Sequence, residues 1–169
     1  MKRIEEGIGL LLRRRKATLS VAESCTGGWV AHRITNISGS SDYFESGVVS
    51  YSNHAKESLL GVPPSIINQN GPVSEPVARG MAEGIRRKRG TTFGLATTGL
   101  AGPLGGTPEV PVGTVFIALA CPEETVVRRF RFLGTRIQIK RLATEKALEM
   151  LVERLSSNTS GFVGYGRSE

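Results

Sequence analysis

Thr18-Leu-Ser-Val-Ala-Glu-Ser-Cys-Thr-Gly-Gly28 is the stretch that decides the fold prediction for this sequence. Residues 18–22 are mainly apolar and include Thr and Val, a composition typical of a short buried strand. Polar residues and two glycines follow, and residues 29–37 then show helical periodicity. The stretch therefore predicts a strand, a sharp turn and a helix.

The predicted turn brings chemically useful groups to the start of a helix. Ser24 offers a hydroxyl, Cys25 a thiol, and residues 25–28 offer backbone N–H groups that the helix itself leaves unpaired. Such a helix start favours a bound anion or a developing oxyanion. The alternative interpretation is an ordinary helix cap, because Ser, Thr and Gly commonly precede helices.

Length and composition indicate one globular domain. The 169 residues are 39% apolar and 22% charged, and no apolar run approaches the roughly 20 residues that span a bilayer. Cys25 and Cys121 lie far apart and lack the spacing of metal ligands. No signal peptide is recognised, so we expect a cytoplasmic protein with free thiols, no metal site and no membrane association.

The net charge of +7 raises the question of nucleic-acid binding, because basic residues cluster at 13–16, 86–89 and 128–131. Two of these clusters end predicted helices, where cations suit the helix dipole, and the third alternates along a predicted strand. Aromatic residues make up only 6% of the chain, so no platform for stacking bases is indicated. The charge favours a small phosphorylated ligand over nucleic acid.

The remaining elements follow from hydrophobic periodicity and from helix start and stop signals. Besides the central stretch, we expect helices over 4–15, 53–60, 75–89 and 135–155, and strands over 43–51, 92–97, 113–121 and 125–132. Residues 65–71 are predicted as a loop with a short helical turn. The order predicts a single α/β domain over 1–157, with a mixed, mostly parallel sheet covered by helices on both faces, and a flexible tail over 158–169.

Three predicted strands end in polar or glycine-rich segments, at residues 23–28, 51–56 and 98–107. Ligands of open α/β sheets bind beyond the carboxyl ends of the strands, so parallel strands would bring these segments together. The meeting point would hold four polar side chains, those of Ser24, Tyr51, Lys56 and Thr98. The 98–107 segment contains four glycines and is either a ligand-binding loop or a structural Ω-loop.

A serine nucleophile at this point needs a base. Lys56 serves only if its pKa falls toward neutrality, which burial or a neighbouring cation would achieve. The alternative for Lys56 is a solvated helix lysine. Of the two histidines, His32 lies inside a predicted helix away from Ser24, whereas His54 stays open as a second candidate base.

Three ordered motifs resemble the CinA C-terminal domain family, whose stand-alone members are the nicotinamide-nucleotide amidases called PncC. They are Ala22-Glu-Ser-Cys-Thr-Gly-Gly28, Gly47-Val-Val-Ser-Tyr-Ser-Asn-His-Ala-Lys56, and Thr98-Gly-Leu-Ala-Gly-Pro103 with the residues that follow it to Thr114. The resemblance covers residues 4–155. It implies hydrolysis of nicotinamide mononucleotide to nicotinate mononucleotide and ammonia, without a cofactor, by a cytoplasmic homo-oligomer.

Carried over by motif, the resemblance implies that Ser24 is the nucleophile and Lys56 its base, with Tyr51 beside them. The residues expected to bind the substrate are Cys25, Thr26, Gly27, Gly28, Thr98, Gly99, Gly102, Gly105, Gly106, Thr107, Arg136, Lys140 and Arg141. The family's last helix often opens with Gly-Asp-Arg and has a further Arg a turn later, whereas here it opens with Gly134-Thr-Arg136 and has Lys140-Arg141 at the next turn. The missing Asp bears on the cap of this helix, and the lysine at 140 leaves Lys140 and Arg141 as alternatives for the phosphate-binding cation. The competing hypothesis is a non-catalytic nucleotide- or phosphate-binding module associated with competence, which needs the glycines but not Lys56.

Overall fold

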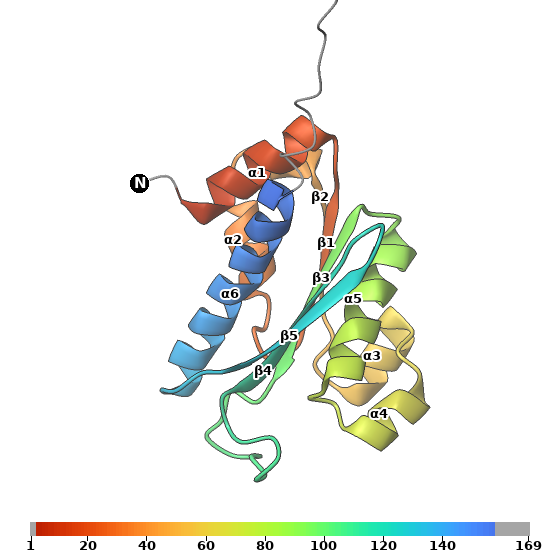
Figure 1. Cartoon of the computed structure of the whole chain (residues 1–169), viewed down its shortest axis with the longest axis vertical. Helices are drawn as coiled ribbons and strands as arrows, with labels where there is room; N and C mark the ends of the chain where they lie inside the picture. The colour runs from red at the N-terminus through yellow and green to blue at the C-terminus, as the bar shows by residue number, and fades with distance from the viewer. Residues whose placement is uncertain (1–2, 158–169) are drawn as a thin grey trace, which may run out of the picture.

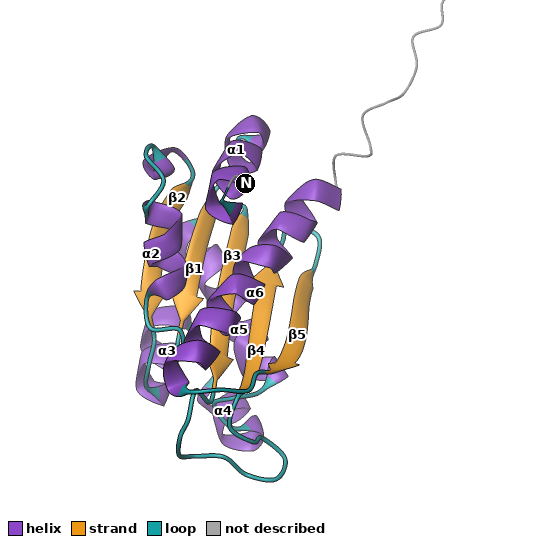
Figure 2. Cartoon of the chain, turned by 90° about the vertical axis from the view of Figure 1, so that its left-hand side faces the viewer, coloured by secondary structure: helices purple, strands orange, loops and turns teal. Residues whose placement is uncertain are grey.

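Five strands form one sheet in the order β2-β1-β3-β4-β5 (Figures 1 and 2). The computed structural model describes residues 3–157 and places the strands at β1 (Leu19–Glu23), β2 (Phe44–Val49), β3 (Phe93–Gly99), β4 (Thr114–Ala120) and β5 (Thr125–Arg131). Strand β1 pairs in parallel with β2 and β3, whereas β4 is antiparallel to β3 and β5. The predicted mixed sheet, parallel at its centre, is confirmed.

Helices cover both faces of the sheet (Figure 1). Helices α1 (Ile4–Arg15), α2 (Trp29–Thr35) and α6 (Arg136–Ser157) lie on one face, and α5 (Glu75–Arg89) packs along the other. Helices α3 (Asn53–Leu60) and α4 (Pro64–Asn70) pack against α5. Two apolar cores result, one under α1, α2 and α6 and one under α5, and the central strands β1 and β3 are buried between them.

The path of the chain locates the site. The connection from β1 to β2 runs through α2 on one face of the sheet, whereas the connection from β2 to β3 runs through α5 on the other face. The order of strands therefore reverses between β1 and β3. At such a switch point the two connections leave in opposite directions and open a crevice beyond the strand ends.

Several element bounds differ from the sequence predictions. Strand β2 ends at Val49, two residues before its predicted end, and α6 continues two residues beyond its predicted end, to Ser157. Residues 64–70 form helix α4 instead of a loop, with a proline in the first turn, where its missing N–H costs nothing. Strand β3 continues to Gly99 because its pairing with β4 extends to Val115. Helix α2 ends at Thr35, two residues before its predicted end at Ile37. The predicted flexible tail over 158–169 lies outside the described residues.

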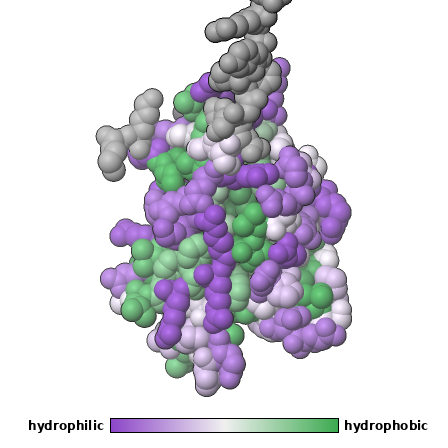
Figure 3. All heavy atoms as spheres, viewed as in Figure 1, coloured by the Kyte–Doolittle hydropathy of each residue, from purple (hydrophilic) through white to green (hydrophobic). Residues whose placement is uncertain are grey.

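The surface is mostly hydrophilic in the view of Figure 3, with an apolar area over the beginning of α6 at the lower left. Leu133 and Ile137 of this segment are 78% and 57% exposed. Within residues 3–157, no helix is both long and apolar enough to cross a membrane.

Candidate active site

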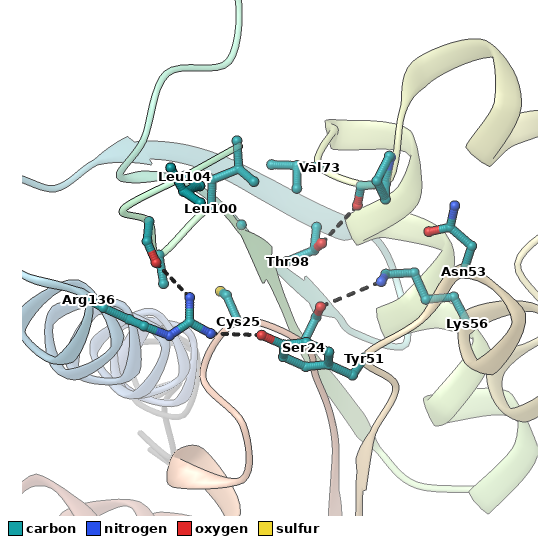
Figure 4. A pocket seen from close by; sticks show the side chains of 14 residues that line it. Ser24, Cys25, Tyr51, Asn53, Lys56, Val73, Thr98, Leu100, Leu104 and Arg136 are labelled. Atoms are coloured by element: carbon teal, nitrogen blue, oxygen red, sulfur yellow. Dashed lines mark hydrogen bonds between the residues drawn. The ribbon is translucent and has the colours of Figure 1, made fainter. Parts of the chain in front are cut away.

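A pocket with a cavity volume of about 220 Å³ lies at the switch point of the sheet (Figure 4). Ser24 enters it from the turn after β1, Lys56 from α3, Thr98 from β3 and Arg136 from the beginning of α6. The three predicted segments therefore meet, as expected. The residues that line the pocket are Ser24, Cys25, Tyr51, Asn53, Lys56, Pro72, Val73, Thr98, Gly99, Leu100, Ala101, Gly102, Leu104 and Arg136.

Ser24 and Lys56 face each other in the pocket. Lys56 Nζ lies 3.5 Å from Ser24 Oγ and donates a hydrogen bond to it (Figure 4). Ser52 caps α3 by accepting a hydrogen bond from the Ala55 N–H at 3.0 Å, which places Lys56 on the first turn, over the end of β1. The side chain of Lys56 is only 2% exposed, so the interpretation of a solvated helix lysine is wrong.

Burial shifts the protonation equilibrium of Lys56 toward the neutral amine. Desolvation lowers the pKa of the Lys56 ammonium below the usual value of a lysine. Of the two causes considered, burial or a neighbouring cation, burial produces the lowering, and the Coulombic interaction with Cys25 opposes it. No acidic side chain among residues 3–157 forms an ion pair with Lys56. A neutral amine next to a hydroxyl is the arrangement that a general base requires.

Cys25 and His54 are the alternative candidates for the nucleophile and the base. Burial raises the pKa of the Cys25 thiol to about 12, so this side chain stays a protonated, poorly nucleophilic thiol at neutral pH. His54 is exposed and does not line the pocket. Ser24 and Lys56 are therefore the best-placed nucleophile and base.

The turn between β1 and α2 differs from the prediction, because the start of the helix is already occupied. The carboxylate of Glu23 accepts hydrogen bonds from the N–H groups of Gly28, Val30 and Ala31 at 2.9–3.1 Å. The Gly27 N–H donates to the Ser24 carbonyl at 3.1 Å. The expectation that Gly27 and Gly28 offer free N–H groups to a ligand is therefore wrong.

Two N–H groups of this turn stay available. Within the described residues, those of Cys25 and Thr26 have no hydrogen-bond acceptor on another residue. The Thr26 side chain is fully buried, and its hydroxyl donates to Glu23 at 2.6 Å. Thr26 therefore offers its backbone, not its side chain, to chemistry at Ser24.

Arg136 bridges two walls of the pocket. One guanidinium nitrogen donates to the Gly102 carbonyl at 2.7 Å and another donates to the Tyr51 hydroxyl at 2.8 Å (Figure 4). Tyr51 is 60% exposed, and among residues 3–157 its hydroxyl has no hydrogen bond with Ser24 or Lys56. Tyr51 therefore lies beside the pair as predicted, but its hydroxyl is directed at Arg136.

The two alternatives for a phosphate-binding cation lie on different sides of α6. Lys140 Nζ lies 4.9 Å from the centre of the Trp29 ring, and a Cβ on Gly27 would be 3.2 Å from it, so Lys140 reaches the turn next to Ser24. Arg141 lines a separate groove with Trp29 and His32. Arg136 and Lys140 share a face of α6 because they are four residues apart. Neither Lys140 nor Arg141 lines the pocket itself.

The glycine-rich loop after β3 contributes its first part to the pocket. Thr98, Gly99 and Gly102 line the cavity, and the Thr98 hydroxyl donates to the Pro72 carbonyl at 2.8 Å. Gly105, Gly106 and Thr107 do not line it and are exposed. Thr107 instead closes the tip of the loop by exchanging hydrogen bonds with Val110.

Sequence reasoning missed two polar residues of the site. Asn53 lines the pocket from the first turn of α3. Glu23 accepts the backbone hydrogen bonds that hold the turn between β1 and α2. The signal for Glu23 is an acidic residue at the end of an apolar strand, a few residues before a helix that lacks an acidic first turn. In the described part of the chain, no group of three or more His, Cys, Asp or Glu side chains is arranged to hold a metal ion.

The fold and the pocket define an α/β domain with a polar site at the sheet's switch point, and comparison with known proteins gives its family. The family model "CinA C-terminal domain" matches residues 1–155. The chain belongs to this family.

Relatives and solved structures agree with this assignment. A CinA-like protein of Syntrophus aciditrophicus is 53% identical over 158 residues, which are 93% of this chain and 38% of the relative. A putative competence-damage inducible protein of Moorella thermoacetica is 49% identical over 148 residues, which are 88% of this chain and 36% of the relative. The chain thus spans less than two fifths of the length of these relatives.

Crystal structures share the whole fold. The competence damage-inducible protein A from Klebsiella pneumoniae has a TM-score of 0.87 at 31% identity, covering 90% of this chain and 95% of the other. The competence/damage inducible protein CihA from Agrobacterium tumefaciens has a TM-score of 0.84 at 35% identity, covering 90% of this chain and 98% of the other.

Proposed function

We propose that this chain is a nicotinamide-nucleotide amidohydrolase, which converts nicotinamide mononucleotide to nicotinate mononucleotide and ammonia. The observation that carries the proposal is the buried Lys56 amine, 3.5 Å from the Ser24 hydroxyl and without an acidic partner in the described chain. The substrate itself comes from the resemblance of the three motifs to the amidases of this family.

In the proposed reaction, neutral Lys56 takes the hydroxyl proton of Ser24 as the Oγ attacks the carboxamide carbon. The carbonyl oxygen becomes an oxyanion, for which the unpaired N–H groups of Cys25 and Thr26 are the candidate donors in this turn. Lys56 then returns its proton to the leaving nitrogen, the carbon–nitrogen bond of the tetrahedral intermediate breaks, and ammonia departs to leave an ester on Ser24. Water, deprotonated by Lys56, hydrolyses the ester to the carboxylate product and frees Ser24.

The charges around the pocket suit a substrate with a phosphate. A cavity of about 220 Å³ is smaller than the ~300–1,000 Å³ of pockets that enclose whole ligands, so it accommodates the reacting ring and leaves the rest at the rim. Arg136 lies at that rim, and Lys140 reaches the adjacent turn from the same face of α6. We assign the phosphate to these two cations, because Glu23 occupies the start of α2.

The competing function is a nucleotide-binding module without catalysis, associated with competence. The names of several relatives refer to competence damage, which is compatible with either function. A module that only binds gains nothing from a lysine that is 2% exposed and lacks an acidic partner, because burying such an amine costs stability. The buried amine beside a hydroxyl therefore favours the enzyme.

A coupled ammonia assay tests the proposal. Purified protein is incubated with nicotinamide mononucleotide, the corresponding riboside and free nicotinamide, and ammonia release is followed for wild type and Ser24→Ala. We expect release from the mononucleotide, less from the two substrates without phosphate, and none above background from the variant. Saturable binding of the mononucleotide without release of ammonia would instead support the binding module.

A further inference from the structure

Glu23 is the buried acid next to Ser24, and its environment is unusual for a residue that ends a strand. Its side chain is 1% exposed, and no basic side chain among residues 3–157 forms an ion pair with it. The charge is satisfied by hydrogen bonds from backbone N–H groups of Gly28, Val30 and Ala31 and from the Thr26 hydroxyl. The carboxylate thus binds residues on the C-terminal side of Ser24, in the turn and at the start of α2.

We propose that Glu23 is a positioning residue for the reaction, which holds the turn so that the Ser24 hydroxyl points at Lys56. This inference rests on the proposed serine nucleophile. Glu23 does not line the pocket, and it acts through the Thr26 hydroxyl and the N–H groups at the start of α2.

Thr97 of strand β3 also binds the turn, and we call Glu23 and Thr97 together the clamp. The Ser24 N–H donates to the Thr97 carbonyl at 2.9 Å, and the Thr97 hydroxyl shares a hydrogen bond of 2.7 Å with the Thr26 hydroxyl. Glu23 Oε2 accepts from that same Thr26 hydroxyl at 2.6 Å. Glu23 and Thr97 therefore both hold the turn: they share the Thr26 hydroxyl, and Thr97 also binds the backbone of Ser24.

Glu23 also determines which backbone N–H groups of the turn stay free to bind an oxyanion. Because Glu23 takes the Gly28, Val30 and Ala31 donors, the unpaired N–H groups of the turn are reduced to those of Cys25 and Thr26. Without the carboxylate, three N–H groups at the start of α2 lose their acceptor, and a backbone rotation that pairs them would move Ser24. A displacement of about 1 Å is enough to reduce catalysis about 100-fold.

Glu5 offers a matched control. It is also a buried glutamate, 6% exposed, and it also anchors α2, but through an ion pair with Arg33 in the last turn of the helix. Glu5 does not line the pocket. Loss of the Glu5 carboxylate therefore weakens the same helix without touching the turn.

The test measures the reactivity of Ser24 directly. The full chain is treated with an alkyl fluorophosphonate, and the rate of labelling is followed by intact-protein mass. In this reaction the Ser24 Oγ–phosphorus bond forms, the phosphorus–fluorine bond breaks, fluoride leaves, and Lys56 takes the hydroxyl proton. Wild type is compared with Glu23→Gln, Glu23→Ala and Glu5→Gln, with Ser24→Ala to verify the labelled residue.

We expect Glu23→Ala to be labelled about 100-fold more slowly than wild type and Glu23→Gln about 10-fold more slowly. The intermediate effect follows because glutamine keeps one oxygen, and Oε2 alone serves three of the four donors. Glu5→Gln should melt at a lower temperature but react at the wild-type rate. If Glu23→Ala does not fold, the labelling rates of Glu23→Gln and Glu5→Gln are compared, and slower labelling of Glu23→Gln alone supports the role of Glu23.

Three results would overturn the inference: wild-type labelling rates in both Glu23 variants, an equal slowing in Glu5→Gln, or a wild-type protein that the probe does not label at Ser24. A different result would refute the proposed amidase activity. Wild type that is labelled at Ser24 but releases no ammonia from nicotinamide mononucleotide would refute the amidase proposal and keep the role of Glu23. With an active amidase, the Glu23 variants should lower kcat and leave KM nearly unchanged.

Discussion

The turn after β1 and the loop after β3 meet at the same pocket, but they are held in place by different means. Residues 24–26 of the turn are buried, and Glu23 and Thr97 bind the Thr26 hydroxyl, the Ser24 N–H and the Gly28 N–H. In the loop, residues 103–109 are exposed, and Arg136 fastens it from outside through the Gly102 carbonyl. The difference indicates a division of labour, in which the turn fixes the reacting atoms and the loop adapts to the ligand.

The largest expected effect comes from the turn. Ser24→Ala should fold normally, because it removes one oxygen from a side chain whose backbone N–H keeps its bond to Thr97. Turnover should fall at least about 1,000-fold, the scale seen when a nucleophile is removed. Steady-state kinetics and a thermal melt check this expectation, and near-normal turnover would move the nucleophile to another group.

Lys56→Arg should be nearly as inactive as Ser24→Ala. Arginine keeps a positive charge but cannot give up its proton, so it cannot serve as a base. In wild type, burial lowers the pKa of Lys56, and the proposed mechanism uses the neutral amine. Hence kcat/KM should rise with pH and level off above that pKa, at a pH below the ~10.4 of a free lysine. A profile that falls with rising pH over this range, or an active arginine variant, would exclude Lys56 as the base.

A smaller effect, on KM instead of kcat, should come from Arg136, which holds the loop through the Gly102 carbonyl. Arg136→Lys keeps the charge but cannot bridge Gly102 and Tyr51 as the planar guanidinium does. We expect KM for nicotinamide mononucleotide to rise about 10-fold with kcat changed much less, because only uniform binding is lost. Arg141→Lys is the matched control, since Arg141 lies in another groove and should leave both constants unchanged. A fall in kcat at constant KM would contradict the assigned division of labour.

The smallest effect should come from Cys25, although it is adjacent to Ser24. With its pKa raised to about 12, the thiol is protonated at neutral pH and contributes no thiolate. Cys25→Ala should keep turnover within about threefold of wild type, because the candidate oxyanion donor at this position is the backbone N–H. Kinetics of this variant check the point, and a loss comparable to that of Ser24→Ala would make the side chain part of the reaction.

The sequence was a good guide to the architecture and to the central pair, because both depend on local patterns. Apolar strands followed by polar turns predicted where the segments 23–28, 51–56 and 98–107 would meet, and Ser24 and Lys56 face each other there. The direction of individual side chains was less accessible. Arg141 and Thr107 belong to predicted binding segments but point elsewhere, because helix phase and loop closure decide their direction.

Glu23 shows a second limit of sequence reasoning. The helix-start signal was identified correctly, but the anion that the helix attracts is supplied by the chain itself, five to eight residues upstream of the donors. Helix α4 was missed for a simpler reason. It is seven residues long and has one buried apolar residue, Ile67, so little periodicity reveals it.

The antiparallel edge of the sheet has a consequence for association between chains. Strand β5 exposes Arg128, Arg129 and Arg131, whose charges would be brought together if a second copy extended the sheet along this edge. Arg128 pairs with Glu153, and Arg129 lies over the Phe116 ring, so these side chains are also anchored to the chain's own surface. The edge is thus protected against strand addition and aggregation, and self-association of this protein is expected to use another surface.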